Sequence, residues 1–224
     1  DIVRLLVGCG PASPPTLARY DDRRWVRGSG YRRTMDRPIV AVLAGGDSTR
    51  MGFDKAEAPI GSLTMLETVI DAVATMGDVV VVGRATAPYA TPALPDRRTD
   101  ARGPLTGLET VMHRYPGRTY VLVAVDHPFV RRATLNALLA LDGDAVVPLD
   151  DGWQQVTCAV YRPTFLTAAT AVLDAGGRSI IAALDHVDTR LVAEPEWRSW
   201  GEDGRSWFSI DSQERLEIGL RRYG

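Results

Sequence analysis

One lysine, Lys55, stands near the end of a glycine-rich segment of this 224-residue chain, and it is the only lysine in the sequence. The other 25 of the 26 Lys and Arg side chains are arginine. Arginine replaces lysine at little cost on a solvated surface, so a retained lysine favours a site that needs a compact ammonium rather than a planar guanidinium. Chance is the alternative. The segment, residues 43–56, reads LAGGDSTRMGFDKA.

The chemistry of this segment is that of a phosphate-binding loop. Gly45 and Gly46 let the backbone turn tightly, and the N–H groups of such a turn bind anions. Two hydroxyl side chains add donors, and Arg50 adds a second cation beside Lys55. The spacing differs from that of a Walker A loop and from the dinucleotide-binding GxGxxG pattern, which excludes both motifs.

An aspartate follows a second apolar run. Ile39–Leu43 and Tyr120–Val125 are continuous apolar segments, a pattern typical of parallel strands buried on both faces. The carboxyl ends of such strands meet at one edge of the sheet, where ligands bind. Asp126 therefore lies at the same edge as the loop and is a candidate site residue. Asp211 is the second candidate carboxylate, with a helix N-cap as its alternative role.

Strand-like and helix-like periods alternate along the rest of the chain. They predict a three-layer α/β/α Rossmann-like fold with a mostly parallel, mixed central sheet. Residues 85–103 are expected to form a loop. The expected strands are residues 39–43, 79–82, 120–125, 145–148, 154–161 and 207–210. The expected helices are residues 65–76, 104–115, 134–141, 165–173, 179–184 and 212–220.

The first 34 residues differ from the remainder. They hold seven arginines and three aspartates, with scattered Gly and Pro and no sustained period. No long apolar core follows the basic start, so the segment is not a secretory signal. We expect residues 1–34 to be an N-terminal extension that is disordered or not native, with Met35 as the natural start. Residues 35–224 are expected to form a single domain.

Composition excludes several classes of function. A net charge of −2 gives no footprint for nucleic-acid binding. Two cysteines, Cys9 and Cys158, do not make a disulfide framework or a metal site, which fits a reducing cytoplasm. No apolar stretch approaches the length of about 20 residues that spans a bilayer. We expect a cytoplasmic protein that binds neither nucleic acid nor membranes.

The glycine-rich segment closely resembles the signature of the molybdenum cofactor guanylyltransferases and their MobA-like NTP transferase relatives. Three further stretches match the family in order. They are Gly103–Leu108 (GPLTGL), Val125–Pro128 (VDHP) and Phe208–Glu214 (FSIDSQE). The resemblance covers roughly residues 37–220.

This resemblance implies a nucleotidyltransferase fold and a Mg²⁺-dependent enzyme. It implies transfer of GMP from GTP to the terminal phosphate of molybdopterin, with release of pyrophosphate. The partners implied are GTP, molybdopterin and, transiently, other proteins of molybdenum cofactor biosynthesis. An ionised phosphate nucleophile needs no general base, so catalysis would consist of positioning and charge neutralisation.

The resemblance also implies roles for single residues. Asp126 holds Mg²⁺, with Asp211 as the second metal ligand, and Arg50 and Lys55 draw charge toward the leaving pyrophosphate. An aspartate shortly before the GPL stretch contacts GTP, and either Asp96 or Asp100 fits its place. The nucleotide-binding residues implied are Leu43, Ala44, Gly45, Gly46, Lys55, Asp96 or Asp100, and Asp126.

Two departures from the family pattern bear on the choice of base. The chain reads Val82-Gly83-Arg84 where the family usually has an asparagine after the second strand. Asp211 stands where many guanylyltransferases have asparagine and related cytidylyltransferases have aspartate. Cytidylyl transfer, or transfer to another phosphorylated small molecule, therefore stays open. A non-catalytic nucleotide-binding module is the alternative of another class, and the presence of Lys55 and Asp126 argues against it.

Four conspicuous side chains have a structural and a functional interpretation. We expect Trp197, Trp200 and Trp207 to pack in the core or in a lid. The alternative is a wall of the acceptor site, because aromatic faces stack on flat rings such as a pterin. We expect His127, beside Asp126, to be packed or hydrogen-bonded rather than catalytic.

Overall fold

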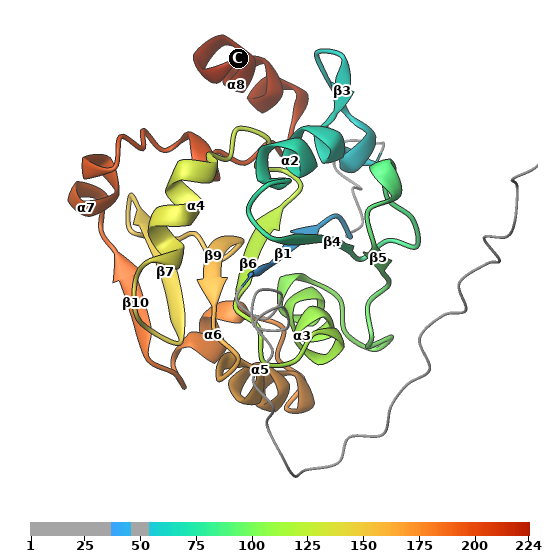
Figure 1. Cartoon of the computed structure of the whole chain (residues 1–224), viewed down its shortest axis with the longest axis vertical. Helices are drawn as coiled ribbons and strands as arrows, with labels where there is room; N and C mark the ends of the chain where they lie inside the picture. The colour runs from blue at the N-terminus through green and yellow to red at the C-terminus, as the bar shows by residue number, and fades with distance from the viewer. Residues whose placement is uncertain (1–36, 46–53) are drawn as a thin grey trace, which may run out of the picture.

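The structure, a computed structural model, describes residues 37–45 and 54–224 (Figure 1). The segment 1–34, expected to be an extension, lies outside the described residues. Gly46 and Arg50 of the predicted phosphate-binding loop also lie outside them. The other predicted site residues are all described.

A mixed sheet forms the centre of the fold. Along the main path its strand order is β10-β7-β9-β6-β1-β4-β5, and β8 pairs with β7 outside this path. Neighbours on the path are parallel except at β9, which is antiparallel to both β6 and β7. The strands are β1 (Ile39–Leu43), β4 (Asp78–Val82), β5 (Ala93–Leu94), β6 (Tyr120–Ala124), β7 (Ala145–Asp150), β8 (Trp153–Gln154), β9 (Cys158–Tyr161) and β10 (Thr189–Val192).

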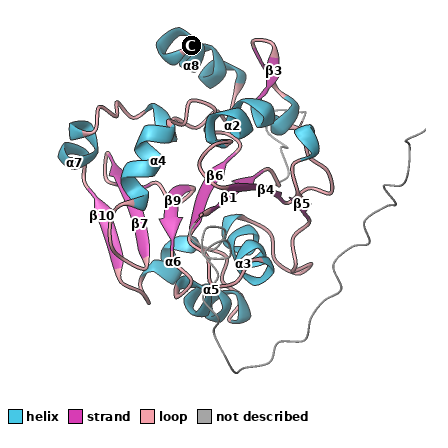
Figure 2. Cartoon of the chain, viewed as in Figure 1, coloured by secondary structure: helices cyan, strands magenta, loops and turns pink. Residues whose placement is uncertain are grey.

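Helices cover both faces of this sheet, which confirms the predicted three layers (Figures 1 and 2). One face carries α2 (Met65–Val73), α4 (Arg132–Leu139) and α8 (Gln213–Tyr223). The other carries α3 (Pro104–Arg114), α5 (Phe165–Asp174) and α6 (Ile180–Leu184). The remaining elements are α7 (Glu194–Ser199), the hairpin β2 (Pro59–Ile60) and β3 (Leu63–Thr64), and the 3-10 turns η1 (Lys55–Glu57), η2 (Pro88–Ala90) and η3 (Arg205–Trp207).

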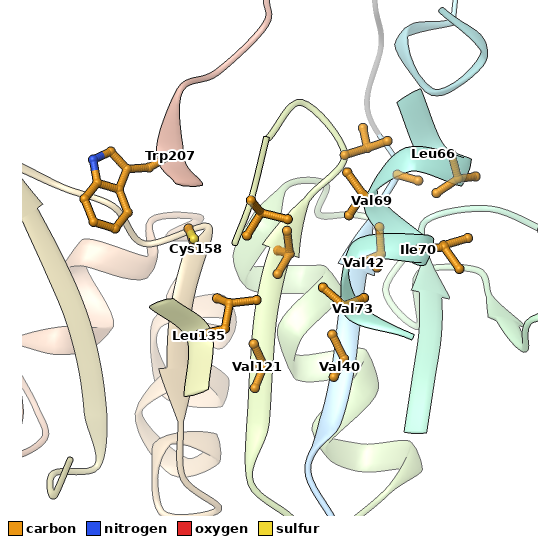
Figure 3. Close-up of a cluster of buried hydrophobic side chains, with 14 of the residues drawn as sticks. Val40, Val42, Leu66, Val69, Ile70, Val73, Val121, Leu135, Cys158 and Trp207 are labelled. Carbon is orange, nitrogen blue, oxygen red and sulfur yellow. The ribbon is translucent and has the colours of Figure 1, made fainter. Parts of the chain in front are cut away.

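The apolar run of β1 is buried on both faces because successive side chains enter different cores. Val40 and Val42 pack beneath α2 (Figure 3). Ile39, Ala41 and Leu43 pack against the α3 side of the sheet. Burial on both faces makes β1 a rigid base for whatever follows its carboxyl end.

Helix α2 follows directly from its sequence. Thr64 and Glu67 form a capping box in which the Thr64 side chain accepts from the Glu67 N–H and the Glu67 carboxylate accepts from the Thr64 N–H. Apolar residues at helical spacing then face β1. The helix therefore begins at Met65, as the pattern predicts. In the described part of the chain, no helix is long and apolar enough to cross a membrane.

Two of the expected strands are wrong in part or in whole. Residues 207–210 are not a strand, because Trp207 ends η3 and the segment pairs with β6 only through the N–H of Ile210 and the carbonyl of Asp126, 2.8 Å apart. The expected strand 154–161 is interrupted by a turn in which the Cys158 N–H donates to the carbonyl of Gln155. Its two parts are β8 and β9, and they pair with different strands.

Several short elements lie where none is expected. The expected loop 85–103 contains β5, which lengthens the sheet beyond β4, and the 3-10 turn η2. Between α6 and η3 the chain forms the edge strand β10 and then α7. Two neighbouring residues of β10, Arg190 and Leu191, are both exposed, so the strand lacks the alternation that marks a half-buried strand.

Candidate functional site

A cavity of about 780 Å³ opens at the carboxyl edge of β1, β4 and β6. This is where open α/β sheets bind ligands, and the volume lies in the range of small-molecule sites. Its lining comes from the loops after these strands, the start of α3 and the approach to β9. The lining includes Leu43, Ala44, Gly45, Lys55, Gly83, Asp96, Arg98, Gly103, Asp126, Gln155, Thr157, Trp207 and Ser209.

Lys55 and Asp126 meet in this cavity although they lie far apart in the sequence. The Nζ of Lys55 is 3.8 Å from Oδ2 of Asp126, and both side chains are about three-quarters buried, with 22% and 25% of their surface exposed. Ser209 Oγ donates to the same Oδ2 at 3.1 Å. The carbonyl of Asp126 accepts from Ile210, so the closing segment is held against the end of β6.

Two contacts fix the backbone that carries Lys55. Asp54 caps η1, because its Oδ1 accepts from the N–H of Ala56 at 3.0 Å. Arg84, just after β4, donates to Asp54 at 2.6 Å and to Glu57 at 2.8 Å. Arg84 lies in the stretch that departs from the family pattern, and here it ties the Lys55 segment to β4.

Gly45 and Gly83 bring the loops after β1 and β4 into backbone contact. Gly83 has φ +86°, and a Cβ added there would lie 2.5 Å from the Cα of Gly45. A Cβ on Gly45 would lie 2.8 Å from the Cα of Gly83. Both positions thus require glycine for close approach, and Gly83 also for its conformation.

We expect Gly83→Ala to destabilise the fold by about 1–3 kcal/mol, because the backbone is left-handed and the methyl group overlaps Gly45. Denaturant unfolding measures this. Gly117→Ala is the matched control, since Gly117 has φ +75° but open space around its Cα. Equal losses in the two variants would show that the contact with Gly45 contributes nothing.

The loop before α3 distinguishes between the two aspartates left open by the sequence. Asp96 lines the cavity, and its Oδ1 lies near the position of a Gly107 Cβ. Burial raises the pKa of Asp96, and the positive charge of Arg102 opposes that shift. Asp100 is exposed and does not line the cavity, and its carbonyl accepts from Arg178. Of the two aspartates, Asp96 is therefore the one that lines the cavity.

A buried carboxylate that the sequence analysis did not single out holds this loop. Glu109 of α3 is fully buried and accepts hydrogen bonds from Arg97 and from Arg98, the latter at 3.2 Å. Arg98 lines the cavity and also donates to Asp174 of α5 at 2.7 Å. Burial alone would raise the pKa of Glu109, but the hydrogen bonds from the two arginines outweigh it and keep the pKa below its usual value.

We expect Glu109→Gln to lower the free energy of unfolding by about 2–4 kcal/mol at pH 7, because two arginines lose a buried partner. The folded-state pKa is depressed, so the stabilisation is present above the unfolded pKa of about 4.3 and is lost as the pH falls through the lower folded value. Denaturant unfolding from pH 7 to pH 3 measures the difference. It should shrink with acidification, while Glu217→Gln, on the exposed face of α8, should show no such trend.

His127 is buried and packed, as expected, although it also lines the cavity. It is 4% exposed, and its Nε2 lies 3.1 Å from the hydroxyl of Thr157. Burial lowers the pKa of His127, and the neighbouring Asp126 only partly offsets this.

Two of the three tryptophans considered as an acceptor wall are core residues. Trp197 is fully buried and packs edge-on against Trp207, with ring centroids 5.0 Å apart. Trp207 is 4% exposed, lies near Cys158 at the start of β9, and lines the cavity (Figure 3). Trp200 is half-buried, packs against the same core and does not line the cavity.

The predicted site residues thus separate into three groups. Asp100 and Asp211 are exposed and do not line the cavity. The helix cap that was an alternative for Asp211 is made by Ser212, whose hydroxyl accepts from Arg215. Gly46 and Arg50 are not among the described residues. The cavity brings together Leu43, Ala44, Gly45, Lys55, Asp96 and Asp126.

The sequence of this chain is similar to that of proteins of a known family. The family model of the MobA-like NTP transferase domain matches residues 40–187. A protein of Natronomonas pharaonis, named probable molybdenum cofactor guanylyltransferase, is 31% identical over 199 residues, which cover 81% of this chain and 96% of that protein. The chain belongs to the MobA-like NTP transferase family. The matched residues of this family domain include both Lys55 and Asp126.

Solved structures share the fold of this MobA-like domain. The molybdopterin-guanine dinucleotide biosynthesis protein A of Archaeoglobus fulgidus superposes with a TM-score of 0.73 at 21% identity, over 82% of this chain and 97% of that one. The 2-C-methyl-D-erythritol 4-phosphate cytidylyltransferase of Thermus thermophilus gives 0.63 at 15%, over 83% and 98%. These likenesses confirm the predicted Rossmann-like nucleotidyltransferase fold.

Proposed function

We propose that this protein transfers GMP from GTP to the terminal phosphate of molybdopterin and releases pyrophosphate, a step of molybdenum cofactor biosynthesis. Its membership in the MobA-like NTP transferase family and the guanylyltransferase names of its relatives support the reaction. The observation that carries it is the meeting of Lys55 and Asp126 in a cavity at the carboxyl edge of the sheet.

The geometry favours transfer of a charged group. An oxygen of the acceptor phosphate bonds to the α-phosphorus of GTP while the bond to pyrophosphate breaks. Opposite unit charges 4 Å apart attract by about 4 kcal/mol at an effective dielectric constant of about 20. Lys55, tied down through Asp54 and Arg84, supplies such a charge at a fixed place. Arg50 would add another, and an ionised phosphate nucleophile needs no base.

The backbone after β1 would bind the nucleotide. The loops at Gly45 and Gly83 leave no side chain between the ligand and the peptide groups. Leu43, Ala44, Gly45 and Gly46 would contact base and phosphate. Asp96 would accept hydrogen bonds from GTP. Asp100 lies in the same loop before α3 as Asp96, but it is exposed and is the weaker of the two candidates.

Asp126 fits a magnesium ion as its protein ligand. Its carboxylate is partly exposed to the cavity and rigidly seated at the end of β6. Among residues 37–45 and 54–224 no group of three or more His, Cys, Asp and Glu side chains is arranged to hold a metal. Mg²⁺ commonly binds through one or two carboxylates, phosphate oxygens and water, so a single carboxylate is compatible. Asp211, the second ligand that the resemblance implies, is exposed and does not line the cavity, so we propose Asp126 alone as the protein ligand. The ion, when bound, would neutralise the phosphates.

We also propose that the protein acts in the cytoplasm. Cysteine usage favours a reducing cytoplasm. Cys158, the cysteine that the structure describes, is a buried free thiol. We also propose transient contact with the proteins that deliver molybdopterin and receive the product.

Turnover of GTP and CTP side by side tests the choice of base. Purified protein with Mg²⁺ and molybdopterin should release pyrophosphate faster from GTP than from CTP. A preference for CTP would support the cytidylyl alternative, which Asp211 keeps open. Nucleotide binding without turnover and without a requirement for Mg²⁺ would instead support a non-catalytic binding module.

A further inference from the structure

Trp153 is the most exposed large apolar side chain in the described part of the chain, with 74% of its surface accessible. A single exposed apolar residue is ordinary on a protein surface and indicates nothing alone. The position of Trp153 in the fold, rather than its exposure, is what connects it to the cavity.

The topology puts Trp153 at the functional edge of the sheet. Strand β7 is antiparallel to β9, and β9 is antiparallel to β6, so β7 and β6 run in the same direction (Figure 1). The carboxyl end of β7, at Asp150, therefore lies at the same edge as Ala124 and the cavity. The β7–β8 hairpin extends from this edge, two strand spacings, or about 10 Å, from β6.

Trp153 itself does not line the cavity, but the pairing register puts it beside Gln155, which does. Trp153 lies opposite Asp150, and the N–H of Gln155 donates to the carbonyl of Pro148 at 2.8 Å. Residues two apart in an extended ladder share a face, so Trp153 and Gln155 point to the same side. Gln155 lines the cavity, and its Nε2 donates to the carbonyl of Trp153 at 3.1 Å.

The hairpin that carries Trp153 is tightly closed. Asp151 and Gly152, its two turn residues, have φ 48° and φ 78°. Positive φ at both central residues marks the type I′ turn, whose twist matches that of the paired strands and which favours Asp-Gly. The backbone that carries Trp153 is therefore fixed before any ligand arrives, so stacking on the indole would order little backbone.

We propose that Trp153 is the stacking platform for the flat heteroaromatic ring of the phosphorylated acceptor. The nucleotide loops at Gly45 and Gly83 and the Lys55 segment lie on the β1 and β4 side of Asp126, and the hairpin lies on the opposite side. An acceptor whose phosphate reaches Asp126 extends past Gln155 toward Trp153. This inference rests on the proposed function, and its occupant is the pterin of molybdopterin.

Steady-state kinetics of Trp153→Ala with varied molybdopterin test the proposal. Stacking losses on alanine substitution predict a KM for molybdopterin raised about tenfold, with the KM for GTP and the kcat at saturating acceptor unchanged. Trp153→Phe should restore most of the affinity. Tyr89→Ala is the matched control: Tyr89 is also an exposed aromatic residue, 56% accessible, but it lies in η2, and none of the residues of that turn lines the cavity. Because Trp153 is exposed, the melting temperature should not change.

A fluorescence titration separates this inference from the proposed function. Molybdopterin should quench part of the wild-type tryptophan emission, and Trp153→Phe should lose that part. Normal turnover of the wild type together with an unchanged molybdopterin KM in Trp153→Ala would overturn the stacking role alone. A wild type that neither binds nor guanylylates molybdopterin would overturn the proposed function and, with it, the occupant named for Trp153.

Discussion

Replacing Asp126 with asparagine should lower kcat for nucleotidyl transfer by about a hundred- to a thousandfold. The change keeps the size of the side chain and an oxygen that can accept from Ser209, but it removes the charge at the end of β6. Loss of one preorganised electrostatic group in an active site typically has an effect of this size. Pyrophosphate release under saturating GTP and molybdopterin measures it, at several concentrations of Mg²⁺.

Two controls make the Asp126 result specific. Asp100→Asn removes a carboxylate from the exposed part of the loop before α3 and should leave kcat within about twofold. The melting temperature of Asp126→Asn should stay close to that of the wild type, because the pair with Lys55 is partly exposed and the exchange keeps an acceptor for Ser209. A variant that turns over at the wild-type rate would exclude Asp126 from the reaction.

Replacing Lys55 with methionine should lower kcat/KM for GTP by about a hundredfold or more. A unit charge 4 Å from a phosphate oxygen is worth about 4 kcal/mol at the effective dielectric of a partly buried site, and water offsets part of that. Lys55→Arg keeps the charge but widens the group. It should still lose about tenfold, because a planar guanidinium does not occupy the site of a compact ammonium 3.8 Å from Asp126.

Arg221→Lys is the matched exchange in the opposite direction. Arg221 lies on α8 with 70% of its side chain exposed, so a lysine there should leave the kinetics unchanged. Wild-type kinetics in Lys55→Arg would show that the site tolerates either cation. The need for a positive charge would then not explain why position 55 is lysine rather than arginine, even if Lys55→Met is inactive.

The parts of the fold that position the site were predictable because their signals are strong and local. Ile39–Leu43 and Tyr120–Ala124 are apolar throughout, since both faces of β1 and β6 are buried. Parallel strands bring their carboxyl ends to one edge. That rule alone was enough to place Lys55 and Asp126 together.

The predictions that failed or stayed open depend on contacts between residues far apart in the sequence, which no short sequence pattern contains. Residues 207–210 look like a strand because three of the four are apolar, yet their backbone bond toward the sheet joins Ile210 to Asp126, which lies just beyond β6. The choice between Asp96 and Asp100 depends on the path of a loop fixed by Glu109. Glu109 carries a weak signal, a lone acid among the apolar residues of α3, and its partners become visible only in three dimensions.

The hairpin that carries Trp153 has a clear sequence signal, yet it was not predicted. Asp151-Gly152 between strand-like residues is a recognisable hairpin signal, and it stands in the sequence beside an aromatic residue. The expected strand 154–161 concealed the hairpin, because apolar and β-branched residues continue through the turn that separates β8 from β9. The register of β7 and β8 then decides which way Trp153 faces.

Following the phosphates of labelled GTP through the reaction tests the central claim most directly. GTP labelled at the α-phosphorus and, in a parallel sample, at the γ-phosphorus is incubated with protein, Mg²⁺ and molybdopterin, and the products are separated by chromatography. The account predicts that the α-label enters a molybdopterin guanine dinucleotide and the γ-label appears in pyrophosphate, in equal amounts. An α-label that remains in free nucleotide, whatever the acceptor concentration, would contradict it.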